Sequence, residues 1–302
     1  MIEDNPKPSN DKIVGHRFRV LVLLLSVFLF QGCHKPNDIS RIQNENGPAQ
    51  SKQSPSDAAN LLDKGDLKLR YQPRKSTREG DTAHKVATNP QVLENIIAHL
   101  NDRIALPWDI VISFEDCDEP DAYYDHDTHQ LKICYQLIDE YYDLFGRKIK
   151  DPDKLDDSVR GALASTFFHE LGHGLVDAWD VPITGKEEDA VDQLSTLVLI
   201  NYSDVGESMA LDGAISFKLY ANLDKGQQKI YWDEHSLDEQ RFYSTICLIY
   251  GNAPEKYAYM VKDGTLPEER AELCREDYPK VARSWRRLLG PYIKKPAQTS
   301  AK

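Results

Sequence analysis

The sequence lacks the positive charge that a nucleic acid-binding protein needs. Its 302 residues include 37 Lys and Arg against 49 Asp and Glu, which gives a formal net charge of −12 at pH 7. Binding to nucleic acid depends on basic side chains that neutralise phosphates. We therefore expect no nucleic acid partner.

The sequence also lacks an apolar run that could span a membrane. The almost unbroken apolar run at residues 20–30 has eleven residues, whereas a transmembrane helix needs about 20. A short run that follows basic residues, here Arg17 and Arg19, is typical of a signal peptide. We therefore predict a signal peptide over residues 1–33 and an exported protein.

The end of this run resembles the lipobox of bacterial lipoproteins. In Phe30-Gln31-Gly32-Cys33, the cysteine would be lipidated and become the mature N-terminus, although Gln31 departs from the small residue usual there. We expect Cys33 to anchor the protein to a membrane of the bacterial cell envelope, where it faces the periplasm or the exterior. Ordinary secretion with cleavage nearby is the alternative.

No C-x-x-C pair occurs among the five cysteines, which argues against a metal site made of them. Without Cys33 an even number remains, and two disulfides could form in an oxidising compartment. Residues 109–114 and 130–135 alternate like strands around a polar turn at 125–129, which predicts a hairpin. Of the three possible pairings, the hairpin favours Cys117 with Cys134, and then Cys247 with Cys274.

The composition divides the rest of the chain. Residues 34–84 are polar and aperiodic, so we expect a disordered tether there, because such a segment cannot bury enough surface to offset its ordering entropy. Residues 85–295 are long enough for a single core, and 296–302 form a tail. The predicted fold class is α+β, with a small antiparallel sheet followed mostly by helices.

The clearest chemical signal is His169-Glu170-Leu171-Gly172-His173, the H-E-x-x-H pattern of zinc hydrolases. Residues four apart on a helix lie one turn above each other, so both imidazoles can bind one Zn²⁺ ion. Glu170 is then placed to act as general base on the water that the ion polarises.

Helical spacing of apolar residues supports this placement. The pattern of residues 158–168 runs directly into the motif, and Ser158 can cap the start of the helix. Gly172 and Gly174 are poor helix formers. They predict either a close approach of another backbone or a helix that ends soon after His173.

A third zinc ligand is expected on the next helix, which follows Pro182 and Gly185. Glu188 and Asp192 lie four residues apart there, so Glu188 could bind zinc while Asp192 accepts the outer imidazole N–H of a ligand histidine. Glu187 is the competing ligand, but no acid lies four residues after it. Acids in a first helical turn also simply complement the helix dipole.

These two segments resemble the gluzincin clan, in which a glutamate on a following helix completes the zinc site. The longer stretches 168–174 and 182–193, with Ile133-Cys134-Tyr135 before them and 235–243 and Cys247 after them, are similar to a bacterial domain family of unknown function that is described as metallopeptidases. The similarity covers roughly residues 85–290. It implies a zincin-like peptidase fold and gives no substrate.

Two further features concern catalysis. His235, Arg241 and Tyr243 are candidates for stabilising an oxyanion, and we favour His235 as the extra catalytic residue. The alternative is that His235 merely precedes a helix, because Ser236 to Glu239 has the pattern of a capping box at a helix start. The strand at residues 130–136 contains no proline and is the candidate edge strand for binding a peptide by strand addition.

We therefore predict a zinc metallopeptidase that acts on a peptide or protein substrate. His169, His173 and Glu188 hold the ion, Glu170 moves the proton, and Asp192 orients a histidine. A catalytically silent zincin-fold binding module at the cell surface is one alternative. A hydrolase of a non-peptide amide, such as a cell-wall bond, is the other.

Overall fold

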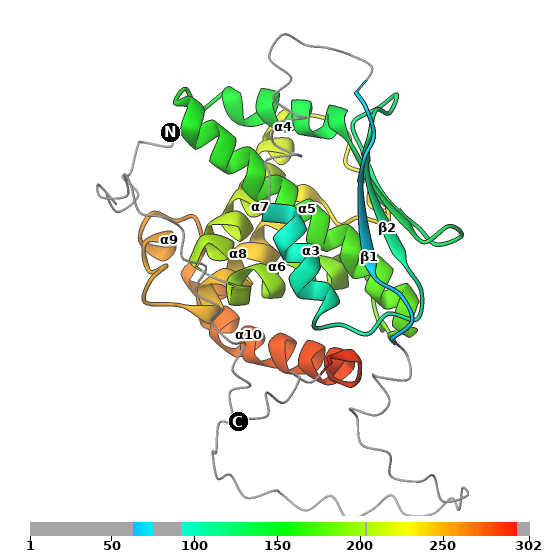
Figure 1. Cartoon of the computed structure of the whole chain (residues 1–302). Helices are drawn as coiled ribbons and strands as arrows, with labels where there is room; N and C mark the ends of the chain where they lie inside the picture. The colour runs from blue at the N-terminus through cyan, green and yellow to red at the C-terminus, as the bar shows by residue number, and fades with distance from the viewer. Residues whose placement is uncertain (1–62, 75–91, 203, 295–302) are drawn as a thin grey trace, which may run out of the picture. The chain divides into compact units, whose positions relative to one another are not determined.

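A four-stranded sheet forms one side of the folded domain and a group of helices forms the other (Figure 1). The structure, a computed structural model, describes residues 63–74, 92–202 and 204–294. All of these belong to the unit Lys52–Lys302. The predicted signal peptide, the lipidation at Cys33, most of the predicted tether and the 296–302 tail lie outside the described residues. None of the described helices has the length and apolar character needed to cross a membrane.

The sheet has the strand order β1-β2-β4-β3. Its strands are β1 (Leu67–Tyr71), β2 (Ile110–Glu115), β3 (Ala122–Asp125) and β4 (Gln130–Cys134). β1 and β4 both pair with β2 in parallel, and only β3 runs antiparallel, beside β4.

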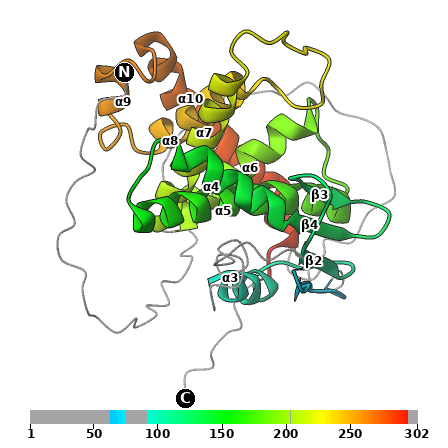
Figure 2. The same ribbon diagram turned by 90° about the horizontal axis from the view of Figure 1, so that it is seen from above.

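The helices follow in chain order around the sheet. They are α3 (Val92–Asn101), α4 (Tyr135–Gly146), α5 (Pro152–Trp179), α6 (Glu187–Tyr202), α7 (Asp204–Leu223), α8 (Asp238–Asn252), α9 (Tyr259–Lys262) and α10 (Glu268–Leu289), with the short 3-10 helix η1 (Gly290–Tyr292) at the end. The predicted α+β class, a small sheet followed mostly by helices, is confirmed. Helices α4 and α5 contact both β4 of the sheet and α7, and Figure 2 shows α3 on the opposite side of α4 and α5 from α7 and α8.

One face of the sheet forms the core with these helices. Alternate residues of a strand point to the same face, and in β2 Ile110, Ile112 and Phe114 are almost fully buried. Their register partners on β4, Leu131 and Ile133, are fully buried as well. This apolar face packs against α5, which carries the H-E-x-x-H motif, and so fixes that helix relative to the sheet.

The predicted hairpin is wrong in its pairing. The polar turn at 125–129 exists, but it joins β3 to β4, and β2 lies parallel to β4. β4 is therefore an interior strand and not the predicted edge. Among the described strands, β3 and β1 are the edges.

Both predicted disulfides, Cys117–Cys134 and Cys247–Cys274, are confirmed. The reason for the first differs from the one the hairpin offered. Parallel strands end at the same edge of a sheet, so Cys117, just after β2, lies beside Cys134 at the end of β4, with 5.5 Å between their Cα atoms. In a hairpin Cys117 would lie opposite the start of the second strand instead.

The predicted tether includes a strand. β1 lies within residues 34–84, yet it pairs with β2 over Leu67 to Tyr71, and Leu67 is buried. The folded domain therefore begins before residue 85. A five-residue strand in a polar segment gives little local signal, since it is stabilised by the pairing with β2.

Candidate metal centre

Helix α5 carries His169, Glu170 and His173 through the middle of the domain. It starts earlier than predicted because Asp151, not Ser158, caps it, accepting hydrogen bonds from the backbone N–H groups of Asp153 and Lys154 at 3.1 and 3.2 Å. The helix continues past the motif to Trp179. The two imidazole rings lie on one face of it, with centroids 5.0 Å apart.

The glycines of α5 mark close approaches of neighbouring elements. A Cβ added at Gly172 would lie 2.9 Å from Cβ of Val191 on α6, and one at Gly174 would lie 3.1 Å from the ring of Tyr124 on β3. The helix does not end at these glycines, and neighbouring elements approach it closely there, although the nearest atoms belong to side chains and not to another backbone as predicted. The close approach at Gly172 brings the first turn of α6 against the face of α5 that carries the histidines.

Glu188, in the first turn of α6, faces both histidines. Its Oε2 lies 3.1 Å from Nε2 of His169, and its Oε1 lies 3.4 Å from Nε2 of His173. One potential ligand atom from each of these three residues lies within 4.8 Å of the others, so the group could hold a metal ion. It is the one such group found among the residues that the structure describes.

Two further carboxylates bind the outer ring nitrogens. Oδ1 of Asp192 lies 2.8 Å from Nδ1 of His169, as predicted for an orienting acid. Oε1 of Glu187 lies 2.8 Å from Nδ1 of His173. The two neighbouring acids therefore differ in position. Glu188 faces Nε2 of both histidines, whereas Glu187 contacts Nδ1 of His173.

His235 reaches the same group from the segment before α8. Its Nε2 lies 2.9 Å from Oε2 of Glu188, and about half of its side chain is exposed. Nζ of Lys186 donates to the backbone carbonyls of Asp233 and His235, at 2.9 and 3.4 Å, and so ties this segment to the start of α6. The capping box expected from Ser236 does not form, because α8 begins at Asp238 and Leu237 precedes it as the cap.

Arg241 and Tyr243, the other two oxyanion candidates, lie differently. The side chain of Arg241 is largely shielded from water and donates two hydrogen bonds to Asp192, so its guanidinium is already paired with a carboxylate. Tyr243 is 40% exposed and is not among the residues that line the cleft described below. Of the three, only His235 contacts a candidate ligand.

Mutual contacts set the charges of this cluster. Burial lowers the pKa of His169, but hydrogen bonds with Asp192 and Glu188 outweigh it and raise the pKa to about 9. Burial raises the pKa of Glu188, but hydrogen bonds with His169, His173 and His235 hold it well below its usual range. The cluster therefore pairs an ionised carboxylate with basic imidazoles.

Glu170 has the opposite environment. Its side chain is buried, and burial raises the pKa of its carboxyl above the usual value. Oε1 of Glu170 lies 3.9 Å from Nε2 of His169. A raised pKa makes the carboxylate a stronger base, which suits a residue that accepts a proton next to a candidate metal centre.

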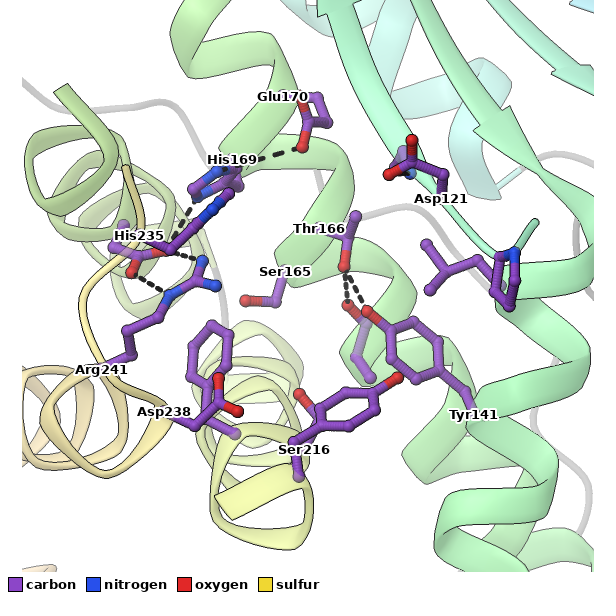
Figure 3. A pocket seen from close by; sticks show the side chains of 17 residues that line it. Asp121, Tyr141, Ser165, Thr166, His169, Glu170, Ser216, His235, Asp238 and Arg241 are labelled. Carbon is purple, nitrogen blue, oxygen red and sulfur yellow. Dashed lines mark hydrogen bonds and ion pairs between the residues drawn. The ribbon is translucent and has the colours of Figure 1, made fainter. Parts of the chain in front are cut away.

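A cleft of about 240 Å³ opens beside His169 and Glu170 (Figure 3). Its walls come from β3, α4, α5, α6, α7 and the start of α8. The cleft residues that the sequence did not indicate include Asp121, Tyr141, Ser216, Phe217, Tyr220 and Asp238. Nothing local marks them, because they come from separate elements. Ser216, Phe217 and Tyr220 reach the cleft because α7 packs closely against α5 at Gly161 and Gly213.

Comparisons with known proteins place the chain in a family. Searches of curated proteins and of solved structures found no match. A family profile does match, over residues 71–289, and its description is "Putative metallopeptidase". This range includes every residue of the candidate metal centre and the whole cleft. The chain thus belongs to this metallopeptidase family, DUF4344.

Proposed function

We propose that this protein is a zinc-dependent peptidase of zincin-like, gluzincin-type fold. The observation that carries the proposal is the convergence of His169, His173 and Glu188 next to Glu170, with a carboxylate on each outer imidazole nitrogen. Family membership supports a metal and a peptide or protein substrate.

The chemistry of the donor set fits zinc. Two imidazole nitrogens and one carboxylate oxygen are the protein ligands of many catalytic zinc sites, which leave a further position open. Histidines that bind metal donate their other N–H to a carboxylate, as His169 does to Asp192 and His173 to Glu187. When bound, Zn²⁺ would act as a Lewis acid that polarises the scissile carbonyl and lowers the pKa of water.

The residues of the chain would then divide the remaining work. Glu170 takes the proton from the attacking water and later passes it to the leaving amine, and burial supports this role because it raises the pKa of the carboxyl and so makes the carboxylate a stronger base. His235, at the mouth of the cleft, is placed to donate a hydrogen bond to the oxygen that becomes negative in the transition state.

The substrate would bind along β3. This strand is an edge of the described sheet, so one side of its backbone has no strand partner there. Asp121 and Ala122, at its start, line the cleft that also contains Glu170. An extended peptide added beside β3 would therefore pass the metal centre. Strand addition fits β3, because β4 already pairs on both sides.

Export and anchoring form a separate part of the proposal. Both disulfides support an oxidising compartment, since such bonds persist outside the cytosol. We propose that Cys33 is lipidated and that cleavage just before it makes it the mature N-terminus. Metabolic labelling with a radioactive fatty acid tests this. The wild type should carry the label and Cys33→Ala should not. An unlabelled wild type would indicate ordinary secretion without a lipid.

Elemental analysis of the purified chain tests the proposed function. We expect one zinc per chain, loss of zinc in His173→Ala, and hydrolysis of casein by the wild type alone. Absence of zinc from the wild type would mean that the histidines and acids form only ion pairs. Stoichiometric zinc with no hydrolysis of casein would favour a binding module, and cleavage of peptidoglycan alone would favour a cell-wall amide.

A further inference from the structure

A buried arginine, Arg241 on α8, holds the acid that contacts His169. Its Nε donates to Oδ2 of Asp192 at 2.7 Å, and its Nη2 donates to Oδ1 of the same carboxylate at 2.8 Å. The planar fork of a guanidinium matches a carboxylate in this two-bond geometry. Side-chain exposures of 14% and 10% show that both partners are largely shielded from water.

Arg241 is itself fixed from another side. Its guanidinium carbon lies 4.1 Å from the ring centroid of Phe217 on α7, a cation–π contact. Asp192 is on α6, so the arginine connects three helices at one point. This leaves the carboxylate of Asp192 little freedom to rotate.

The arginine and the histidine share one oxygen atom. Oδ1 of Asp192 accepts a hydrogen bond from Arg241 and also lies 2.8 Å from Nδ1 of His169. A proton on that Nδ1 points at Asp192, which leaves Nε2 as the nitrogen that faces Glu188 at 3.1 Å. The orientation of the His169 ring therefore depends on an oxygen that Arg241 holds in place.

We propose that Arg241 is a positioning residue of the metal centre: through Asp192, it fixes the ring and the tautomer of His169 and thereby increases the affinity for metal. This inference rests on the proposed function, because it requires a metal at His169, His173 and Glu188.

The two hydrogen bonds of Arg241 described above both go to Asp192 and not into the cleft. Although Arg241 lines the cleft, its Nε and Nη2 are both occupied by Asp192. Removing Arg241 would leave the buried charge of Asp192 with one partner fewer. The carboxylate would then rotate or accept a hydrogen bond from water instead. The effect would reach the metal through His169 and not through the substrate.

Chelator competition for zinc on the full chain tests this. Arg241→Met keeps the apolar stem of the side chain but removes the charge, both hydrogen bonds and the guanidinium that lies over the ring of Phe217. We expect about a tenfold loss of zinc affinity, the low end of the effect of removing a partner of a metal-binding histidine. Arg241→Lys keeps the charge with one contact and should lose less.

A double-mutant cycle separates this role from a structural one. If Arg241 acts through Asp192, the double variant Arg241→Met with Asp192→Asn should bind zinc as weakly as Asp192→Asn alone. Effects that add would show that Arg241 acts by another route, and they would overturn the inference.

Arg74 provides a matched control. It is also buried, contacts the carboxylates of Asp139 and Asp116, and lies 5.7 Å from the ring centroid of Tyr135. None of these residues lines the cleft. Arg74→Met should lower the melting temperature but leave zinc affinity unchanged.

The outcomes distinguish the two proposals. A wild-type chain that binds no zinc contradicts the proposed function itself. A wild type that binds zinc, together with a folded Arg241→Met that binds it equally well, contradicts only the role of Arg241. If Arg241→Met does not fold, the same comparison applies to Arg241→Lys. Wild-type zinc affinity in that variant, or effects that add when it is combined with Asp192→Asn, would overturn the inference.

Discussion

Oε1 of Glu187 lies 2.8 Å from Nδ1 of His173, the ring nitrogen opposite the one that faces Glu188. His169 has the same arrangement, with Asp192 at its Nδ1. Each histidine thus has its own carboxylate, and each can present Nε2 toward Glu188. Two acids that are neighbours in the sequence therefore serve different nitrogen atoms.

Replacing Glu187 should weaken zinc binding. In Glu187→Ala, Nδ1 of His173 loses its acceptor, so the ring becomes free to rotate and less basic. The side chain of Glu187 is 36% exposed against 10% for Asp192, and water can partly replace it. We therefore expect roughly a tenfold loss of affinity, the smaller end of the usual range.

The control for this prediction is Asp189→Ala. Asp189 is in the same acidic first turn of α6, but no contact with either histidine is found for it. If both variants weaken zinc binding equally, the effect comes from the charge of the turn and not from the Glu187–His173 contact. Both affinities can be measured by competition with a chromophoric chelator.

Glu170→Gln should keep zinc and lose hydrolysis. The amide has the shape of the carboxylate but cannot accept the proton, and general acid–base catalysis contributes typically about 10²- to 10⁴-fold. Zinc content by elemental analysis and kcat/KM on a peptide substrate should therefore change independently. Wild-type kcat/KM in this variant would exclude Glu170 as the base.

Zinc affinity should rise with pH up to about pH 9. Hydrogen bonds with Asp192 and Glu188 outweigh burial and raise the pKa of His169 to about 9, and zinc needs the neutral imidazole. Binding must therefore release this proton, and affinity should increase by about tenfold per pH unit below pH 9. A flat profile between pH 7 and pH 9 would contradict the raised pKa.

The stability of the apoprotein should change in the opposite direction. A histidine whose pKa is higher in the folded than in the unfolded state stabilises the fold fully below the unfolded value near 6.5, and this stabilisation is lost as the pH rises through 9. The melting temperature of chelator-treated wild type should fall over this window. In Asp192→Asn, where one cause of the raised pKa is removed, the fall should be smaller.

The helices of the centre could be predicted because local patterns specify them. Apolar spacing and a Pro-Gly break defined α5 and α6, and helix geometry alone placed His169 and His173 on one face. The start of α5 was misplaced because Asp151 is followed by a polar first turn, which gives no apolar period to detect.

Contacts between distant segments could not be predicted in this way. Both β2 and β4 were recognised as strands, but their parallel pairing depends on β3, whose four residues are too few to show an alternating pattern. Which atom of Glu187 or Arg241 meets which partner depends on how α6 and α8 pack on α5. The directions in which these side chains point are therefore set only in the folded chain.

Removing the disulfide between α8 and α10 should destabilise the domain by about 3.5 kcal/mol, as expected for closing a loop of this size in the chain-entropy model. Cys247 and Cys274 are both buried, and 27 residues separate them. Both cysteines are replaced by alanine and not by serine, because serine would bury a hydroxyl group. Urea unfolding of this variant measures the effect, and a free energy of unfolding equal to that of the wild type would contradict it.

Gly172→Ala should disturb the metal centre through packing alone. The added methyl group would lie 2.9 Å from Cβ of Val191, so α5 and α6 must separate slightly, and overpacking of this kind costs about 1 to 3 kcal/mol. Because Glu188 is on α6, the separation should also weaken zinc binding. Val191→Ala in the same chain removes the second contact, with Cγ1 at 3.0 Å, but keeps Cβ, so it should restore only part of both losses. Gly146→Ala is the control, since its Cβ would meet only Leu155 at 3.8 Å. Equal zinc affinity in Gly172→Ala and Gly146→Ala would show that the spacing of the two helices does not determine the geometry of the ligands.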